Sequence, residues 1–148
     1  MRWPIDALIP HRGPMRLIDH LIDWDAQSIR VGLHVPDEGL FHDARGVPSY
    51  VGIEYMAQAV AAWAGCQARA RGAAPPLGFL LGTRRYECTL DHFLVGMDLV
   101  VDARCELMGE NGLGAFACQI SRNDEVLANA LISVFEPPDA AAFLENTS

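Results

Sequence analysis

Residues 50–66 read YVGIEYMAQAVAAWAGC, a run in which Glu54 and Gln58 carry the only carboxyl and amide side chains. The two residues are four apart, so on a helix they lie one turn apart on the same face. A carboxylate in apolar surroundings is costly unless it is paired or held neutral. A carboxyl group that holds and releases a proton suits general acid catalysis, whereas a Glu at a wet groove or subunit contact would have no chemical role. The pattern alone leaves both interpretations open.

The same run predicts one long, buried helix over residues 50–71. Ser49 is the predicted N-cap, and Gly72 with the following prolines is expected to end the helix. The apolar run is slightly short for a membrane span and contains a carboxyl group, so a helix inside a globular domain is the better interpretation. Because the helix is apolar on nearly all sides, it must be covered on more than one side.

Strand patterns follow in most of the remaining chain. SIRVGLHV at residues 28–35 alternates between apolar and polar or small side chains, which is typical of a half-buried antiparallel strand. A short helical turn is expected at residues 4–8. Further strands are predicted over residues 15–24, 77–90, 97–108, 113–121 and 126–135, with turns at Asn111-Gly112 and Asn123-Asp124.

These elements predict an α+β domain in which a curved antiparallel sheet of about six strands wraps one long central helix. A single domain over residues 1–148 is expected, with a core at about residues 8–137 and a C-terminal tail at 138–148. A second subunit is expected to cover the part of the helix that the sheet leaves open.

Composition excludes several functional classes. The net charge of −8 argues against nucleic acid and anionic membranes as partners. All eleven basic residues are Arg, so Schiff-base chemistry and a Walker-type phosphate loop, which both need Lys, are excluded. The four cysteines form no CxxC pair and have no His at ligand spacing, so we expect no metal site and reduced thiols. With an N-terminus that lacks signal-peptide features, this favours a cytoplasmic protein.

Three motifs, in order, resemble those of the bacterial 3-hydroxyacyl-acyl-carrier-protein dehydratases, a family with the hot-dog fold. LIPHRGPMRLID at residues 8–19 is similar to the family's opening Leu-Pro-His-Arg-x-Pro-hydrophobic-Asp. EYMAQ at residues 54–58 resembles the Glu-x-x-Ala-Gln of its central helix, and GMD at residues 96–98 resembles a later Gly-x-Asp turn. Segments around residues 51–58, 81–88 and 112–116 look closest to the dehydratase-like proteins of aryl polyene biosynthesis.

The resemblance implies a hot-dog dimer, either a homodimer or a heterodimer with another dehydratase-like subunit. Its substrate would be a 3-hydroxyacyl chain on the phosphopantetheine of an acyl carrier protein, with no other cofactor. Removal of water would give the trans-2-enoyl thioester, in polyene or fatty-acid-like synthesis. By position, Glu54 matches the acid that protonates the departing hydroxyl, and His42 lies in the loop that supplies the base to the facing subunit. Gln58 would orient Glu54, and His11 is interpreted as structural.

Other residues are candidate substrate contacts. The helix start at Ser49, Val51 and Gly52 offers backbone N–H groups and the positive end of the helix dipole to a thioester carbonyl. Close helix packing explains Gly52 equally well. Arg84 and Arg85 could bind the phosphate of the phosphopantetheine arm or acidic groups of the carrier protein, or could simply be solvated.

Two alternatives to an active dehydratase remain. The loop here reads FHDARGVP at residues 41–48, where the family has Gly-His-Phe-Pro-Gly-x-Pro, and the span from His42 to Glu54 is shorter. Each extended residue spans about 3.3–3.6 Å, whereas proton transfer needs heavy atoms about 2.6–3.2 Å apart. The short loop therefore favours a non-catalytic acyl-binding or dimerisation subunit of a dehydratase complex. A hot-dog thioesterase, in which Glu54 activates water, is disfavoured because no second acidic or hydroxyl partner lies near Glu54 in the sequence.

Overall fold

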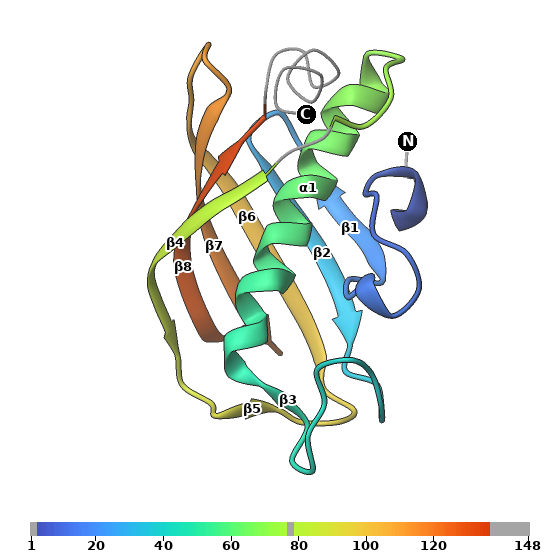
Figure 1. The fold of residues 1–148 in the computed structure, drawn as a ribbon, viewed down its shortest axis with the longest axis vertical. Helices are drawn as coiled ribbons and strands as arrows, with labels where there is room; N and C mark the ends of the chain where they lie inside the picture. Colours follow the sequence, from blue (N-terminus) through green and yellow to red (C-terminus); the bar gives the residue numbers. More distant parts are fainter. Residues whose placement is uncertain (1–2, 77–78, 137–148) are drawn as a thin grey trace, which may run out of the picture.

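The chain folds as one long helix that lies across a curved antiparallel sheet (Figure 1). The computed structural model describes residues 3–76 and 79–136. Helix α1 spans Gly52–Ala70, and the six-stranded sheet has the order β1-β2-β6-β7-β8-β4. Its strands are β1 (His20–Trp24), β2 (Ser28–His34), β4 (Phe79–Cys88), β6 (Asp98–Met108), β7 (Leu113–Arg122) and β8 (Glu125–Phe135). The predicted α+β architecture with six antiparallel strands is confirmed.

Both predicted turns are present. The β7–β8 connection consists of Asn123 and Asp124, which have φ angles of 51° and 68°. Two successive residues with positive φ form a type I′ turn, the geometry that suits the twist of a two-residue hairpin. Gly112, with a φ of 89°, ends the longer β6–β7 connection. The two hairpins place β6, β7 and β8 side by side in the centre of the sheet.

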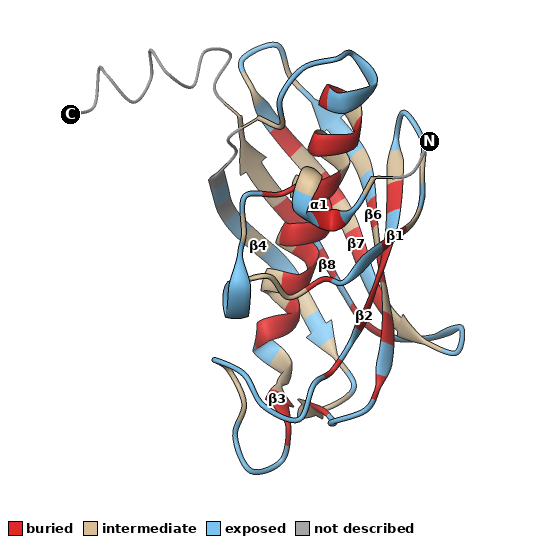
Figure 2. Cartoon of the chain, turned by 90° about the vertical axis from the view of Figure 1, so that its right-hand side faces the viewer, coloured by how far each residue is buried: buried red, intermediate tan, exposed pale blue. Residues whose placement is uncertain are grey.

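The core lies between α1 and the inner face of the sheet (Figure 2). The predicted alternation in β2 is confirmed, because Ile29, Val31 and Leu33 are buried while Arg30 and His34 are exposed. On the helix side, Met56, Ala59 and Ala62 are fully buried. Burial of a side chain as large as Met or Ile contributes about 1.5–3 kcal/mol, so this layer is a main source of stability.

The N-terminal segment lies beside α1 on the side of β1 (Figure 1), and the Trp3 ring packs against the Trp24 ring of β1 with centroids 5.8 Å apart. It contains two short 3-10 helices, η1 (Ile5–Ala7) and η2 (Gly13–Met15). The approach is close at Gly65, where a side-chain Cβ would overlap the Leu8 carbonyl group. Arg69 Nε donates to Ala7 O at 2.9 Å and holds the segment further along the helix. Gly65 is therefore the position at which the segment before residue 10 rests on the helix.

Some element boundaries differ from the prediction. The strand expected over residues 15–24 begins only at His20, because η2 and an extended linker precede it. A small second sheet pairs β3 (Val47–Pro48) with β5 (His92–Phe93) and was not predicted. These two strands are too short for a periodic pattern to reveal them.

The start of the helix also differs. A 3-10 turn, η3 (Ser49–Val51), precedes α1, and the Ser49 side chain makes no capping hydrogen bond, so the prediction of Ser49 as N-cap was wrong. Instead, Ser49 N donates to Asp91 O at 2.9 Å, and the Tyr86 hydroxyl donates to Ser49 O. Contacts from β4 and the β3–β5 region fix this end of the helix, which local sequence could not indicate.

Within residues 3–76 and 79–136, no helix is long and apolar enough to cross a membrane. All four cysteines are free: Cys66 and Cys118 are buried, and Cys88 and Cys105 are half-buried. The predicted strand residues 77–78 and the tail at 138–148 lie outside the described residues.

Candidate active site

Glu54 lies in the first turn of α1 and faces a cavity of about 190 Å³. Its side chain is 34% exposed. Nearly all other lining residues are apolar, and they come from one face of α1, from the sheet and from the N-terminal segment. The helix contributes Ala57, Val60, Ala61, Trp63 and Ala64, and the remaining apolar walls are Pro10, Pro76, Leu80, Met108, Phe116 and Val134. A mainly apolar cavity with Glu54 in its wall suits an alkyl or polyene chain whose polar end reaches that carboxyl group.

Gln58 fixes the orientation of Glu54. It is fully buried, and its Nε2 donates to Glu54 Oε1 at 3.1 Å and to Met15 O at 2.8 Å. Its Oε1 accepts from Leu17 N at 2.9 Å. Because a backbone N–H can only donate and a carbonyl can only accept, these contacts determine which end of the amide faces Glu54. The amide therefore presents an N–H donor to the carboxyl group, as the helical spacing of the two residues suggested.

His11 also lies beside Glu54, with Nε2 3.6 Å from Glu54 Oε1. Its side chain is 26% exposed and lines the same cavity. Its Nδ1 is buried and has no hydrogen-bond partner among residues 3–76 and 79–136. The sequence interpretation of His11 as structural missed this contact. No local pattern could have revealed it, because the contact depends on Gln58 drawing the Met15–Leu17 segment onto the helix.

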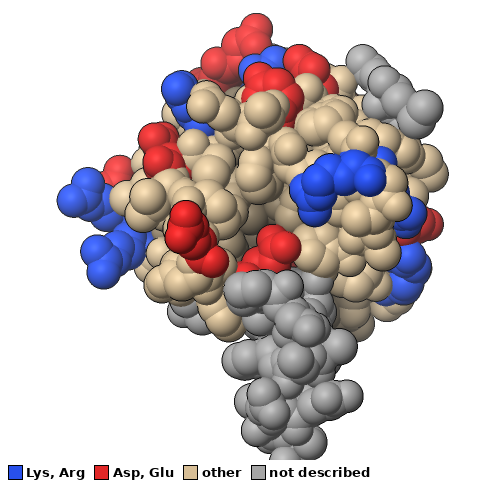
Figure 3. Space-filling view, turned by 90° about the horizontal axis from the view of Figure 1, so that it is seen from above, with Lys and Arg blue, Asp and Glu red and all other residues tan. Residues whose placement is uncertain are grey.

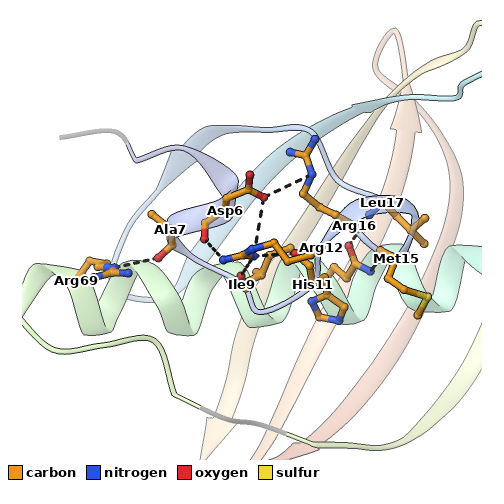
Figure 4. A network of polar contacts seen from close by, with 10 residues as sticks. Asp6, Ala7, Ile9, His11, Arg12, Met15, Arg16, Leu17 and Arg69 are labelled. Carbon is orange, nitrogen blue, oxygen red and sulfur yellow. Dashed lines mark hydrogen bonds and ion pairs between the residues drawn. The ribbon is translucent and has the colours of Figure 1, made fainter.

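The loop that carries His11 is held by a guanidinium group (Figure 4). Arg12 NH1 donates to both Ile9 O and His11 O at 2.7 Å, and Arg12 NH2 donates to Asp6 O at 2.8 Å. The Asp6 carboxylate also lies 3.9 Å from Arg12 and 3.7 Å from Arg16. Three carbonyl groups converge on one cation, so the path of residues 6–12 is closely defined.

His42 lies elsewhere in the chain. It lines a second cavity of about 400 Å³, together with Val51 and Tyr55 from the start of the helix. Its Nε2 donates to Pro36 O at 2.6 Å, because a carbonyl can only accept, and its Nδ1 is buried. Both ring nitrogens are therefore turned toward protein atoms of the same chain. The predicted pairing of His42 with Glu54 acts across two subunits, so it stays a prediction.

The loop of His42 is tied to the small sheet. His92 Nε2 lies 2.8 Å from Asp43 Oδ2, and the hydrogen bond from His92 is the main cause that lowers the pKa of the Asp43 carboxyl group. Arg45 N also donates to Asp43 Oδ1 at 2.8 Å. Asp43 thus joins the loop after His42 to β5.

The predicted thioester-binding residues are packed at the helix start. Val51 and Gly52 are buried, and a Cβ at Gly52 would overlap the Tyr86 hydroxyl. Close packing against the side chains of Tyr86 and Ile120 therefore favours a glycine at position 52. The role of Ser49, Val51 and Gly52 in binding a carbonyl group stays a prediction.

Arg84 and Arg85 are exposed on β4, which forms one edge of the sheet. A bulge falls between Arg84 and Glu87, and Arg85 has a φ of 56° within it. Neither Arg has a hydrogen bond or ion pair with a described residue, so both guanidinium groups are available to a ligand or partner. Their predicted contact with a phosphate or a carrier protein stays a prediction.

A second carboxyl group, Glu136, lines the cavity of Glu54 as well as a neighbouring hollow that includes Gln67 and Arg71. Partial burial raises the pKa of the Glu136 carboxyl group, and the nearby Arg71 opposes this rise. Glu136 therefore marks the end of the cavity near the last turns of α1. Seen from this end, the molecule has a broad uncharged area, hollowed near its centre, with charged side chains around it (Figure 3).

Comparison with known proteins matches the chain to a dehydratase family and to a chain of a dehydratase complex. A family model described as ApeP dehydratase matches residues 3–145. A chain of the dehydratase heterocomplex ApeI:P from Xenorhabdus doucetiae is 27% identical and superimposes with a TM-score of 0.89, covering 100% of this chain and 99% of that one. No curated protein matches the chain in sequence.

More distant structures share the hot-dog fold. A hypothetical thioesterase with coenzyme A from Streptococcus pneumoniae TIGR4 is 10% identical, with a TM-score of 0.62 over 79% of this chain and 84% of that one. The PaaI protein of the E. coli phenylacetic acid degradation operon is 15% identical, with a TM-score of 0.61 over 78% and 80%. At these identities the likeness shows the fold alone.

Proposed function

This chain belongs to the ApeP-like family of dehydratases, and on that premise we propose that it removes water from a 3-hydroxyacyl thioester on an acyl carrier protein. It would act as one subunit of a heterodimer with another dehydratase-like chain. The observation that carries the proposal is Glu54, which sits in an apolar cavity with Gln58 donating to one of its oxygens.

The proposed reaction gives Glu54 the role of general acid. A base takes the proton from C2 of the acyl chain, and the electrons of that C–H bond form the C2=C3 double bond. The C3–O bond breaks, and Glu54 delivers its proton to the departing hydroxyl, which leaves as water. The product is the trans-2-enoyl thioester, and the apolar cavity beside Glu54 would hold the acyl chain.

A partner subunit is proposed to complete the site at the edge of β4. The sheet has two edges, β1 and β4, and β4 contributes Leu80 to the cavity that holds Glu54. Leu80 is 44% exposed although it is apolar. A strand at a sheet edge has free backbone groups that a second chain can pair with. A subunit paired there would cover Leu80 and bring its own loops toward Glu54. The match to a subunit of a dehydratase heterocomplex supports a heterodimer.

A second candidate function is a non-catalytic subunit that supports the active partner. The specific observation in its favour is His42, whose Nε2 is used by Pro36 O and whose Nδ1 is buried. If that arrangement persists in the complex, this chain offers no base to its partner. Any working base would then come from the partner, and this chain would contribute the dimer surface and the acyl-binding cavity.

Dehydration assays on the reconstituted heterodimer separate these functions. Purified subunits are incubated with a 3-hydroxyacyl carrier protein, and the loss of one water is followed by mass spectrometry. Glu54→Gln keeps the size of the side chain and an oxygen acceptor for Gln58 but has no acidic proton. Loss of turnover supports Glu54 as the acid, whereas an unchanged rate would show that Glu54 is not the acid, as expected for a non-catalytic subunit. Release of the free acid would indicate a thioesterase.

A further inference from the structure

We propose that His11 is a positioning residue for Glu54 of the same chain. Its Nε2–H directs the carboxyl group so that Oε1 accepts hydrogen bonds and Oε2 carries the proton that the leaving hydroxyl receives. The inference rests on the proposed role of Glu54 as general acid. It adds a residue of the N-terminal segment to Glu54 and Gln58, the two polar side chains that the helix contributes.

Two nitrogen atoms converge on the same carboxyl oxygen. Gln58 Nε2 donates to Glu54 Oε1 at 3.1 Å, and His11 Nε2 lies 3.6 Å from that atom. In the described part of the chain, no hydrogen bond or ion pair reaches Oε2. A neutral carboxyl group has one oxygen that accepts and one that bears the proton. Donors at Oε1 therefore place the acidic proton on Oε2, which is the oxygen left free for substrate.

The buried face of the imidazole ring determines which nitrogen bears hydrogen. Nδ1 is buried without a partner among the described residues, so an N–H there would be an unpaired buried donor. A proton on Nε2 instead faces the oxygen of Glu54. Neutral His11 therefore has its proton on Nε2 and acts as a donor rather than as the base for C2. The 3.6 Å separation exceeds a normal hydrogen bond, and such contacts in unliganded sites commonly shorten when substrate binds.

The loop around His11 is held at both ends, which is what a positioning residue requires. On the N-terminal side of the loop, the Arg12 guanidinium donates to the carbonyl oxygens of Asp6, Ile9 and His11 (Figure 4). On its C-terminal side, Gln58 binds the Met15 carbonyl. The same Gln58 amide contacts Glu54, so the loop and the acid share one anchor.

The consequence for the reaction is electrostatic. As Glu54 gives up its proton, negative charge develops on the carboxylate, and donors already aimed at Oε1 stabilise that charge in the transition state. Loss of the His11 donor should therefore lower kcat and leave KM nearly unchanged. Replacing a residue that only maintained the fold would change kcat and KM together and would also lower stability.

Two substitutions at position 11 test this donor role in the heterodimer. His11→Gln can place an N–H near the position of Nε2, whereas His11→Phe keeps a ring without a donor. His11→Phe is expected to lower kcat by about 10- to 100-fold, less than the roughly 100- to 1,000-fold lost with a full charge-stabilising donor, because the contact is 3.6 Å long. His11→Gln should retain most of the activity. Equal large losses in both variants, or no loss in His11→Phe, would overturn the proposal.

A second measurement needs no turnover. Nitrogen-15 NMR of the histidine rings in the wild-type protein, at a pH where imidazole is neutral, reports the tautomer, and the loss of one signal in His11→Gln assigns it. We expect His11 to be the Nε2–H form, and an Nδ1–H form would overturn the inference. If the tautomer is as expected but Glu54→Gln remains fully active, the proposed function fails while the His11–Glu54 contact stands.

Discussion

Gln58 is the buried polar residue on which the geometry of the site depends. Among the described residues it is the only fully buried polar side chain, and its three hydrogen bonds connect Glu54, Met15 and Leu17. Removing it would leave the Leu17 N–H and the Met15 carbonyl unpaired in the interior, and a buried group without a partner costs about 1–3 kcal/mol.

We therefore predict that Gln58→Leu lowers the free energy of unfolding by about 1–3 kcal/mol and also lowers kcat. Gln67→Leu on the same helix is the matched control, because Gln67 makes a single hydrogen bond, to Asp25 O at 3.0 Å, at a more exposed position. It should cost no more than about 1 kcal/mol. Urea unfolding of both variants checks this, and equal costs would contradict the account.

The cysteines provide a prediction that depends on ionisation. Burial raises the pKa of the Cys66 thiol to about 11 and that of Cys118 to about 12, so little reactive thiolate exists at pH 8. We expect iodoacetamide to modify half-buried Cys88 at least about tenfold faster than either buried thiol in the folded protein. Peptide mass spectrometry measures the rates. In denaturant the three thiols should react at similar rates. Similar rates in the native protein would contradict the burial of Cys66 and Cys118.

At the scale of single residues, the sequence predicted contacts between neighbours on the same helix. Glu54 and Gln58 lie one turn apart on a helix, and that spacing alone placed the amide beside the carboxyl group. His11 could not be predicted as their neighbour, because tertiary contacts at Met15 and Leu17 bring its loop to the helix. The orientation of the His42 ring was equally inaccessible, since it depends on the carbonyl of Pro36.

At the scale of elements, the packing of the N-terminal segment on α1 positions His11. The segment rests against Gly65, where a Cβ would overlap the Leu8 carbonyl. In an open helix, replacing Gly by Ala stabilises by about 0.5–1 kcal/mol. At position 65 the overlap should reverse the sign.

We expect Gly65→Ala to lower the free energy of unfolding by about 1–3 kcal/mol, the usual cost of overpacking. It should also lower activity, because the segment that carries His11 is displaced. Gly82→Ala serves as the control, since a Cβ there would meet nothing within 4 Å, and its effect should stay within about 0.5 kcal/mol. Thermal unfolding compares the two, and a stabilised Gly65→Ala protein would refute the close contact.

Elements with a long periodic pattern were predictable, and those fixed by contacts were not. The alternation in β2 and the Asn-Asp turn before β8 follow from local chemistry. The start of α1 does not, because the Tyr86 hydroxyl and the Asp91 carbonyl bind Ser49 where a side-chain cap was expected. The pair β3–β5 is likewise held by the fold around it.

At the scale of the whole molecule, the edge strand β4 is the proposed place of the partner subunit. Leu80→Glu puts a charge on this edge beside the cavity, and it is expected to weaken the heterodimer at least about tenfold, because a buried unpaired charge is strongly unfavourable. Val126→Glu is the matched control, since Val126 is 42% exposed and Leu80 is 44% exposed. Light scattering on the mixed subunits measures assembly, and equal effects of the two changes would rule out pairing at β4.

The central claim is that Glu54 supplies the acid for dehydration within a two-subunit enzyme. The most direct test is single-turnover mass spectrometry of a 3-hydroxyacyl carrier protein with the wild-type heterodimer and with the heterodimer that carries Glu54→Gln in this chain. We predict a loss of at least about 100-fold in the rate of water elimination, as expected when a general acid is removed, with assembly unchanged. A Glu54→Gln heterodimer that eliminates water at the wild-type rate would contradict the claim.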